Sequence, residues 1–291
     1  MRFAPDFVDR VLALPWSALP KRGAGAIGER AGAKGAGLEF EEHRAYRPGD
    51  DPTRLDWQIY ARSRKPFVKL QRVLEAQREL VVVDLSASMA FGAEPKLDRA
   101  LRLAAALAIA LAARGASAEI VPLGAPASLA PERLERLVAA RELIAALERW
   151  SAAGDEAALE RARLRLLERR SVARSSRAWI LSDFYALGEW AQFLEALRSR
   201  SARPCLLRIL DAEERSPTLA EPVEWIDAET GERWVASDPA AARAGYAERF
   251  AAHAERLRGF AERHGFPLRE LVEPAQDLPE LVRFERARGA R

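Results

Sequence analysis

The sequence of 291 residues contains a single cysteine, Cys205, so it cannot form an internal disulfide. A chain without disulfides suits a reducing compartment, and Cys205 lies in the apolar stretch CLLRIL, where a buried structural role is expected. Hydrophobic residues make up 49% of the chain, which is enough for a well-filled core. We therefore expect a folded protein that is stabilised by packing rather than by covalent cross-links.

Long apolar runs are also missing. The longest, LAAALAIALAA at 103–113, is shorter than the ~20 residues that a membrane-spanning helix needs. The first residues, MRFAPDFVDRVLALPW, contain acids and prolines where a signal peptide needs an apolar centre. These patterns predict a cytoplasmic protein with no membrane span.

The sequence also lacks a large excess of charge and the common catalytic motifs. Basic residues outnumber acidic ones by 46 to 43, so the composition does not demand a nucleic-acid partner, and none is expected. There is no Walker glycine loop and no Gly-x-Ser-x-Gly elbow. None of the three histidines, His43, His253 and His264, lies near the end of a predicted strand. The sequence therefore favours a protein without enzymatic activity.

What the sequence does contain is an alternation of buried strands and helices. Apolar runs predict strands at 80–85, 118–123, 178–184 and 204–210, with a closing strand at 267–271. Helices are predicted at 95–114, 131–150, 155–171, 187–200 and 239–265, and a hairpin is predicted at 223–236. Such an alternation favours an α/β fold, with a mostly parallel sheet and helices on both of its faces.

Composition divides the chain into three parts. Residues 1–37 combine a short helix, expected to pack on the main domain, with a glycine-rich stretch. Residues 38–74 form a segment dense in charged and aromatic side chains, also expected to pack on that domain. Residues 75–291 form the α/β domain, which includes the hairpin and a long C-terminal helix.

Oxygen-bearing side chains follow two of the predicted strands directly. Asp84 ends one strand, Ser86 and Ser88 follow it at every second position, and Asp183 ends another strand. Ligands bind beyond the carboxyl ends of the strands in an open parallel sheet. Carboxylates and hydroxyls are hard ligands that suit Mg²⁺, Mn²⁺ or Ca²⁺ better than zinc. The pattern predicts a divalent-cation site, and the alternative is that these side chains cap a helix or stabilise a turn.

This Asp-x-Ser-x-Ser spacing resembles the metal-ion-dependent adhesion site of von Willebrand factor A domains, doubly wound α/β folds that bind partner proteins through a divalent cation. The resemblance implies that Asp84, Ser86 and Ser88 are the first group of ligands and Asp183 the later aspartate. That family also supplies a threonine, and the corresponding stretch here, SAAGDEAAL, has none. Asp155 lies nearest to the expected place, either as a substitute ligand or as the mark of a degenerate site with weak binding.

The upstream segment contains a long motif of mixed residue types. Its members are Arg44, Tyr46, Pro48, Gly49, Asp50, Asp51, Asp56, Trp57, Ala61 and Arg62. In this order, ahead of an Asp-x-Ser-x-Ser strand, they resemble the bacterial "domain of unknown function 58" proteins, and the resemblance covers nearly everything after residue 35. Members of that family are commonly associated with MoxR-type AAA+ ATPases, which are thought to remodel or mature other proteins. The resemblance therefore implies an adaptor that works with such an ATPase.

Two roles are open for this segment. Its arginines alternate with Asp50, Asp51 and Asp56, which favours partly buried ion pairs. Trp57 and Tyr60 offer large apolar bodies that could anchor the segment on the α/β domain. Partner binding is given equal weight with this structural role.

Two rival functions follow from other residues. The crevice of Asp84 and Asp183 could serve a metal-dependent hydrolase or a phosphoryl-transfer enzyme. The basic residues at 62–72 carry no intervening acid and could bind nucleic acid, but Phe67 alone among them is aromatic, so the series of interleaved aromatic side chains that base stacking needs is missing.

Overall fold

The computed structural model describes residues 2–16, 38–47, 50, 53, 55–73, 78–124, 129–152, 163–164, 166–168, 177–200, 202–218, 223–228, 230–236 and 238–289. The chain divides into two compact units. The first, which we call the body, comprises Met1–Pro20 and Gln77–Arg291. The second, which we call the inserted unit, comprises Lys21–Ala76.

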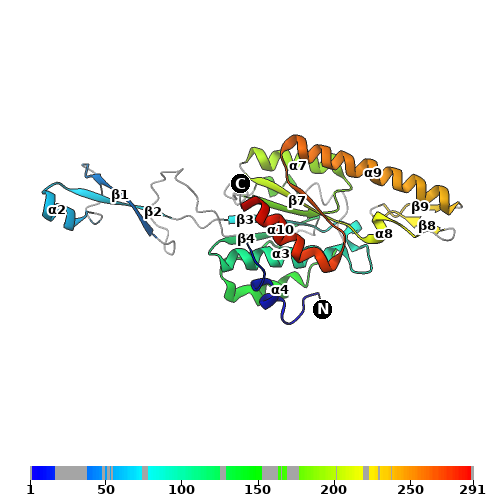
Figure 1. Cartoon of the computed structure of the whole chain (residues 1–291), viewed down its shortest axis with the longest axis horizontal. Helices are drawn as coiled ribbons and strands as arrows, with labels where there is room; N and C mark the ends of the chain where they lie inside the picture. The colour runs from blue at the N-terminus through cyan, green and yellow to red at the C-terminus, as the bar shows by residue number, and fades with distance from the viewer. Residues whose placement is uncertain are drawn as a thin grey trace. The chain divides into compact units, whose positions relative to one another are not determined.

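The body is built on one six-stranded sheet with the strand order β10–β7–β6–β3–β4–β5 (Figure 1). In that order the strands are β10 (Leu268–Leu271), β7 (Arg203–Ile209), β6 (Arg177–Ser182), β3 (Arg78–Asp84), β4 (Ser117–Leu123) and β5 (Glu132–Leu134). Neighbouring strands are parallel except for β4 and β5, which are antiparallel. The predicted α/β class with a mostly parallel sheet is confirmed.

The central strand β3 is buried on both faces, which explains its uninterrupted apolar sequence. Leu80 and Val82 contribute to the core on one face of the sheet, and Val81 and Val83 contribute to the core on the other. Because β3 lies between β4 and β6, its last residue, Asp84, lies in the middle of the carboxyl edge of the sheet.

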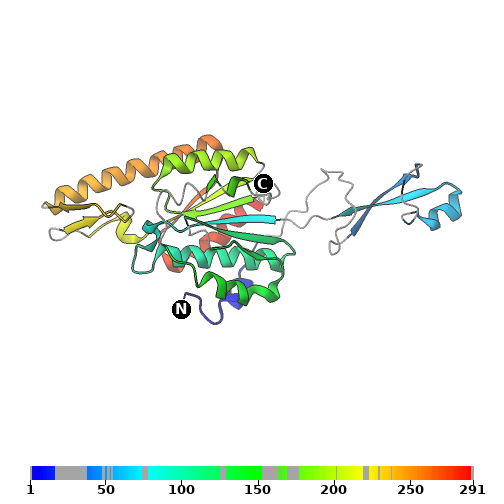
Figure 2. The ribbon, with the colours of Figure 1, turned by 180° about the vertical axis from the view of Figure 1, so that it is seen from behind.

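Helices cover both faces of the sheet (Figures 1 and 2). The face of Val81 is covered by α1 (Phe7–Leu12), α3 (Lys96–Ala113), α4 (Ala140–Leu147) and α10 (Asp277–Gly289). The opposite face is covered by α7 (Leu187–Ser199) and α9 (Pro239–His264). Helix α3 follows Pro95 and stops before Gly115, whose φ of 76° is a left-handed conformation that favours glycine. No helix in the described part of the chain is long and apolar enough to cross a membrane.

Short elements connect these layers. They are η2 (Ala87–Ala90), η3 (Leu137–Ala139), α8 (Ala212–Arg215) and η4 (Pro274–Gln276). The predicted hairpin is formed by β8 (Val223–Ile226) and β9 (Arg233–Ala236), which lie beside the first half of α9 (Figure 1). Its Trp225 ring packs edge-on against Tyr246 of α9, with ring centroids 5.9 Å apart.

The prediction of one helix over 131–150 was wrong in its first half. Glu132–Leu134 forms strand β5, which pairs with Ala118, Glu119 and Ile120 of β4 and fully buries Leu134. Edge pairing therefore overrides the helical pattern here, and the α-helix begins only at Ala140. Of the helix predicted at 155–171, residues 163–164 and 166–168 are helical, and the rest lie outside the described residues.

The inserted unit contains an antiparallel pair, β1 (Leu38–Ala45) and β2 (Phe67–Val73), and a short helix, α2 (Trp57–Ser63). Asp56 caps α2, since its Oδ1 accepts hydrogen bonds from the backbone N–H groups of Gln58 (2.9 Å) and Ile59 (3.2 Å). The helix ends at Arg64, whose φ of 54° is left-handed. The N–H of Asp56 bonds to the carbonyl of Phe67 at 2.8 Å, which ties the start of α2 to β2.

Candidate functional site

Asp84 lies at the end of β3 with only 1% of its surface exposed. Its Oδ1 accepts a hydrogen bond from the backbone N–H of Ser86 at 2.9 Å. Its Oδ2 accepts one from the hydroxyl of Ser182, the last residue of the neighbouring strand β6, at 2.6 Å. The carboxylate is therefore held by one bond from its own loop and one from the adjacent strand.

The two serines of the motif meet each other in the loop that follows Asp84. The Oγ atoms of Ser86 and Ser88 lie 3.1 Å apart. Met89, which follows them in η2, is fully buried and anchors the loop. Two oxygens bound at ~2.1 Å to neighbouring positions of an octahedral ion are about 3 Å apart. The hydroxyl pair thus has the spacing of two adjacent ligands of a magnesium ion.

Asp183 follows β6 and is 2% exposed. Its Oδ2 accepts a hydrogen bond from Lys96 Nζ at 2.8 Å, and its Oδ1 accepts one from the backbone N–H of Tyr185 at 3.3 Å. Its backbone carbonyl accepts a bond from Arg208 Nε at 3.2 Å. The negative charge of Asp183 therefore faces a lysine ammonium within the protein.

Lys96 is the first residue of α3, and its side chain is fully buried. Besides Asp183, its Nζ contacts Glu214 Oε1 at 2.5 Å and lies 5.1 Å from the centroid of the Tyr185 ring. Glu214 belongs to α8, where its Oε2 accepts the backbone N–H of Asp211 at 3.0 Å in a capping box. One buried cation thus joins carboxylates from the end of β6 and from α8.

The electrostatic environment raises the pKa of Asp84 to about 6. Burial is the largest cause and the nearby charge of Asp183 is the second, while the hydrogen bonds from Ser182 and Ser86 act in the opposite direction. A cation beside Asp84 would reverse this effect, because an opposite charge favours the ionised carboxylate. The site is therefore short of positive charge next to Asp84, although Lys96 supplies one next to Asp183.

Aromatic and basic side chains surround this group. Burial, with Glu214 as the second cause, raises the pKa of the Tyr185 hydroxyl far above its ordinary value. The Tyr246 hydroxyl donates to the Glu214 carbonyl at 2.6 Å. Burial lowers the pKa of His253, and Arg208 adds to the effect, which favours a neutral imidazole. Among the described residues no hydrogen-bond partner reaches His253 Nε2.

The structure brings together four of the five predicted ligands: Asp84, Ser86, Ser88 and Asp183. The fifth, Asp155, lies outside the described residues. Within the described ranges, no three His, Cys, Asp or Glu side chains are grouped as a metal site. Any ion held here must therefore depend on hydroxyl oxygens and water as well as on carboxylate.

The predicted residues of the inserted unit have varied roles. Asp50 pairs with Arg44 Nη2 at 2.8 Å and accepts the backbone N–H of Arg47 at 2.8 Å, and these contacts lower its pKa. The backbone N–H of Tyr46 bonds to the carbonyl of Pro66 at 2.9 Å. Asp50 and, as the cap of α2, Asp56 thus stabilise local structure.

Two further residues of that motif lie on the surface. Trp57 is 65% exposed, and Arg62 is exposed as well. Within the inserted unit the Trp57 ring is therefore not buried, and its anchoring role on the α/β domain stays a prediction. Asp51 lies outside the described residues.

Sequence reasoning missed three members of the strand-end group: Lys96, Ser182 and Glu214. Lys96 carried a weak signal, since it is a charged residue at the start of a predicted helix shortly after the Asp-x-Ser-x-Ser motif. Ser182 directly precedes Asp183, so its position also indicated the site. Glu214 carried no comparable signal, because it meets Lys96 from 118 residues away.

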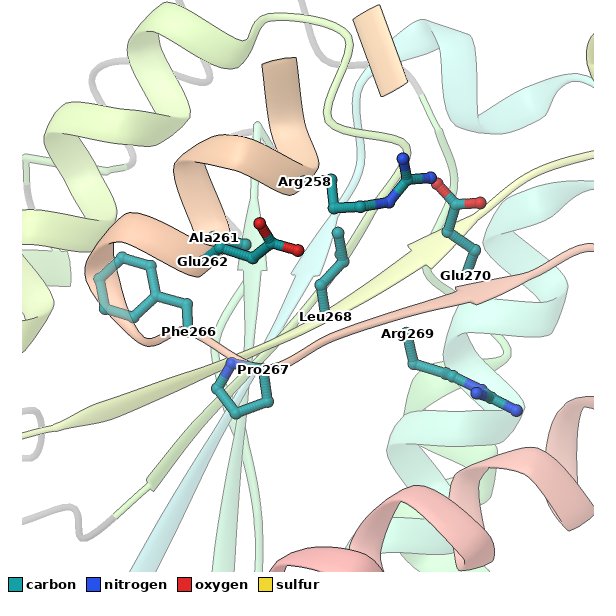
Figure 3. Close-up of a pocket in the computed structure, with 8 residues that line it drawn as sticks. All are labelled: Arg258, Ala261, Glu262, Phe266, Pro267, Leu268, Arg269 and Glu270. Carbon is teal, nitrogen blue, oxygen red and sulfur yellow. The ribbon is translucent and has the colours of Figure 1, made fainter. Parts of the chain in front are cut away.

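A separate cavity of about 510 Å³ lies between the end of α9 and β10 (Figure 3). Its lining is Arg258, Ala261, Glu262, Phe266, Pro267, Leu268, Arg269 and Glu270. The ends of Arg258 and Glu270 point toward one another (Figure 3). The lining has two basic and two acidic side chains and none of the predicted site residues, so it favours no charged ligand.

The family described as "Protein of unknown function DUF58" matches residues 42–256 of this sequence. The chain belongs to the DUF58 family. The family predicted from the motif around Arg44 and Trp57 is thus confirmed. Uncharacterised proteins of Mycobacterium bovis and Mycobacterium tuberculosis are 34% identical to this DUF58 protein over an alignment of 269 residues, and the match covers 88% of this chain and 82% of theirs.

Two solved structures share a more distant likeness. Conserved hypothetical protein BatB from Bacteroides thetaiotaomicron has a TM-score of 0.44 and 11% identity, and the match covers 74% of this chain and 99% of that one. An aerotolerance-related membrane protein from Bacteroides fragilis has a TM-score of 0.41 and 11% identity, with coverage of 73% and 100%. At these scores neither structure adds to the functional assignment.

Proposed function

We propose that this DUF58 protein is a non-enzymatic adaptor that binds a protein partner at the carboxyl edge of its sheet through a weakly held divalent cation. One observation carries the proposal. Asp84 is buried beside a second acid that raises its pKa, and two hydroxyls in the loop that follows it have the spacing of adjacent ion ligands. A cap or a turn alone does not require a buried pair of acids.

Asp84, Ser86 and Ser88 would hold the ion, which would offer open positions to a carboxylate of the partner. Asp183 is engaged by Lys96 at 2.8 Å, so it would assist through water rather than as a direct ligand. One protein carboxylate and two uncharged hydroxyls make a weak site, and Mg²⁺ or Mn²⁺ would keep several waters in it. Ca²⁺ prefers more ligands than these residues supply.

The arrangement offers little for catalysis. Ser86 and Ser88 bond to each other, and Lys96 is held between two carboxylates. The Ser86 hydroxyl also contacts the Asp84 carboxylate, and we assign this contact to ion binding rather than to the activation of a nucleophile. We therefore keep the hydrolase or phosphoryl-transfer function as the alternative, and we expect no turnover of generic phosphatase, esterase or peptidase substrates.

The proposed partner is a MoxR-type AAA+ ATPase or the client of such an ATPase, in the cytoplasm. The support for this partner is the family resemblance. A carboxylate on the partner would complete the coordination of the ion, which makes the interaction dependent on the cation.

Calorimetry and thermal unfolding with Mg²⁺, Mn²⁺ and Ca²⁺ test the cation site. Wild type should bind at millimolar ion and melt at a higher temperature, because a ligand at a hundredfold excess over its Kd stabilises by ~2.7 kcal/mol. Asp84→Ala should abolish the shift, whereas Ser199→Ala, a serine on the outer end of α7 that bonds to the carbonyl of Ala196, should keep it. Absence of binding to wild type would leave Ser86 and Ser88 as turn-forming residues.

Affinity purification tests the partner separately. The tagged wild-type protein should recover the ATPase or its client in Mg²⁺ and lose it in EDTA, and Asp84→Ala should behave like wild type in EDTA. If neither EDTA nor Asp84→Ala reduces recovery of the partner, the partner binds away from the carboxyl edge of the sheet.

A further inference from the structure

The inserted unit presents two aromatic side chains to solvent on its short helix α2. Trp57 is 65% exposed and Tyr60 is 38% exposed. The rings contact each other edge to face, with centroids 6.1 Å apart and planes at 87°. Tryptophan is highly buried on average in folded proteins, so an exposed Trp–Tyr pair indicates a surface that another molecule covers.

The surface around this pair is positively charged. Arg62, Arg64 and Lys65 are exposed, and none of them forms an ion pair with another residue that the structure describes. The nearest acid, Asp56, is 4% exposed because it caps α2. Asp50 is paired with Arg44. Asp50 and Asp56 are thus used internally, and the basic side chains beside α2 remain exposed.

The spacing places the strongest binding groups on one side of α2. Trp57 and Tyr60 stand at positions i and i+3, which are neighbours on one side of a helix, and such pairs are how a helix contacts a groove. Arg64 follows as the residue that ends the helix. Tryptophan, tyrosine and arginine are also the residue types that dominate binding energy at protein interfaces. The N-cap and the bond from Asp56 to Phe67 hold the helix on β2 before any partner arrives, which lowers the entropic cost of binding.

We propose that α2, with Trp57, Tyr60, Arg62, Arg64 and Lys65, is a docking surface for a protein partner that offers an apolar groove bordered by carboxylates. The charge of the surface selects an acidic partner. The geometry of the rings favours protein over nucleic acid, because two planes at 87° do not form the platform on which successive bases stack. The surface belongs to the inserted unit and Asp84 belongs to the body, so different variants test this proposal and the proposed cation site.

Fluorescence anisotropy with a labelled glutamate-rich peptide that has leucine at every fourth residue tests the proposal on the full chain. Wild type should bind the peptide saturably and lose affinity when the salt rises from about 20 to about 200 mM. Trp57→Ala and the double variant Arg62→Gln, Arg64→Gln should each weaken binding at least about tenfold. Asp84→Ala should bind as wild type does, which separates this surface from the cation site.

Matched controls lie on the body. Val138→Ala truncates a side chain that is 86% exposed, and the pair Arg141→Gln, Arg149→Gln removes two exposed charges; neither should weaken binding. Equal binding of a peptide with glutamine in place of glutamate, tighter binding of an oligothymidylate, or no binding of the acidic peptide would each overturn the proposal. A larger fall in Tm for Trp57→Ala than for Val138→Ala would also overturn it, by showing that the ring packs on its own chain.

Discussion

Replacing Lys96 by methionine should strongly destabilise the body. The ammonium of Lys96 is fully buried between Asp183 and Glu214, at 2.8 and 2.5 Å. Methionine fills a similar volume, so the variant removes the charge without opening a large cavity. It leaves two carboxylates close together without their counter-charge, in a region where the Asp183 side chain is 3% and the Glu214 side chain 10% exposed.

The size of the effect follows from this burial. Removing one partner of a buried ion pair costs about 3–5 kcal/mol, because the remaining charge stays desolvated and unpaired. Asp183 should account for most of this loss, since Glu214 is more exposed and keeps its bond from the N–H of Asp211. For a protein of this size the loss corresponds to a fall in Tm of roughly 6–20 °C.

Urea denaturation followed by tryptophan fluorescence measures the change, with Lys65→Met as a control for an exposed lysine. Adding Asp183→Asn to Lys96→Met should recover roughly 2 kcal/mol or more, because the second change removes the charge that lost its partner. The reasoning fails if Lys96→Met loses less than about 1 kcal/mol, or if Asp183→Asn makes it worse.

Three further predictions rest on single residues. Burial and the charge of Asp183 raise the pKa of Asp84 from 3.8 to about 6, so in the ion-free protein the contribution of this residue to stability is fully present below about pH 4 and falls by up to about 3 kcal/mol as pH rises through about 6. Urea titrations should show this loss as the difference between the pH profiles of wild type and Asp84→Asn. Gly92 has a φ of 110°, and a Cβ added there would lie 2.6 Å from a carboxylate oxygen of Asp211, the cap of α8. Gly92→Ala should therefore lower the free energy of unfolding by about 1–3 kcal/mol, measured by thermal denaturation. The control Gly188→Ala should not destabilise, because no atom lies within 4 Å of an added Cβ there. Arg99→Lys removes the bidentate ion pair with Asp277 (2.8 and 2.7 Å) and should lower the free energy of unfolding by about 1.5–3 kcal/mol. Hydrogen exchange in α10, the helix that Asp277 begins, should become faster, and an unchanged rate would contradict the prediction.

The sheet could be predicted from the sequence because its central strands are buried on both faces. β3 and β6 each give a short, unbroken apolar run that ends in a polar residue, and Arg208 alone interrupts the run of β7. The three-residue strand β5 could not be predicted, since its conformation depends on pairing with β4 and its own residues repeat with a helical period. Local pattern thus sufficed for the interior of the sheet and failed at its edge.

The same division applies to the site. Asp84, Ser86 and Ser88 are close in sequence, so their convergence could be predicted from spacing alone, and Asp183 followed from its place at the end of a parallel strand. The bond between Lys96 and Glu214 joins residues that are 118 positions apart. Contacts between residues so far apart in the chain produce no repeating pattern in the sequence. The role of Lys96 as the positive charge beside Asp183 and Glu214 could therefore be found only from the structure.

The two edge strands of the six-stranded sheet, β5 and β10, are short, and their length affects how readily copies of the protein can associate at high concentration. β5 has three residues and β10 has four, whereas the four strands between them have six or seven. A second copy that added a strand at either side would gain only a few backbone hydrogen bonds, and at β10 it would meet the charged side chains Arg269 and Glu270. Short edge strands with charged side chains discourage the addition of further strands, so the six-stranded sheet is protected against aggregation at both of its edges.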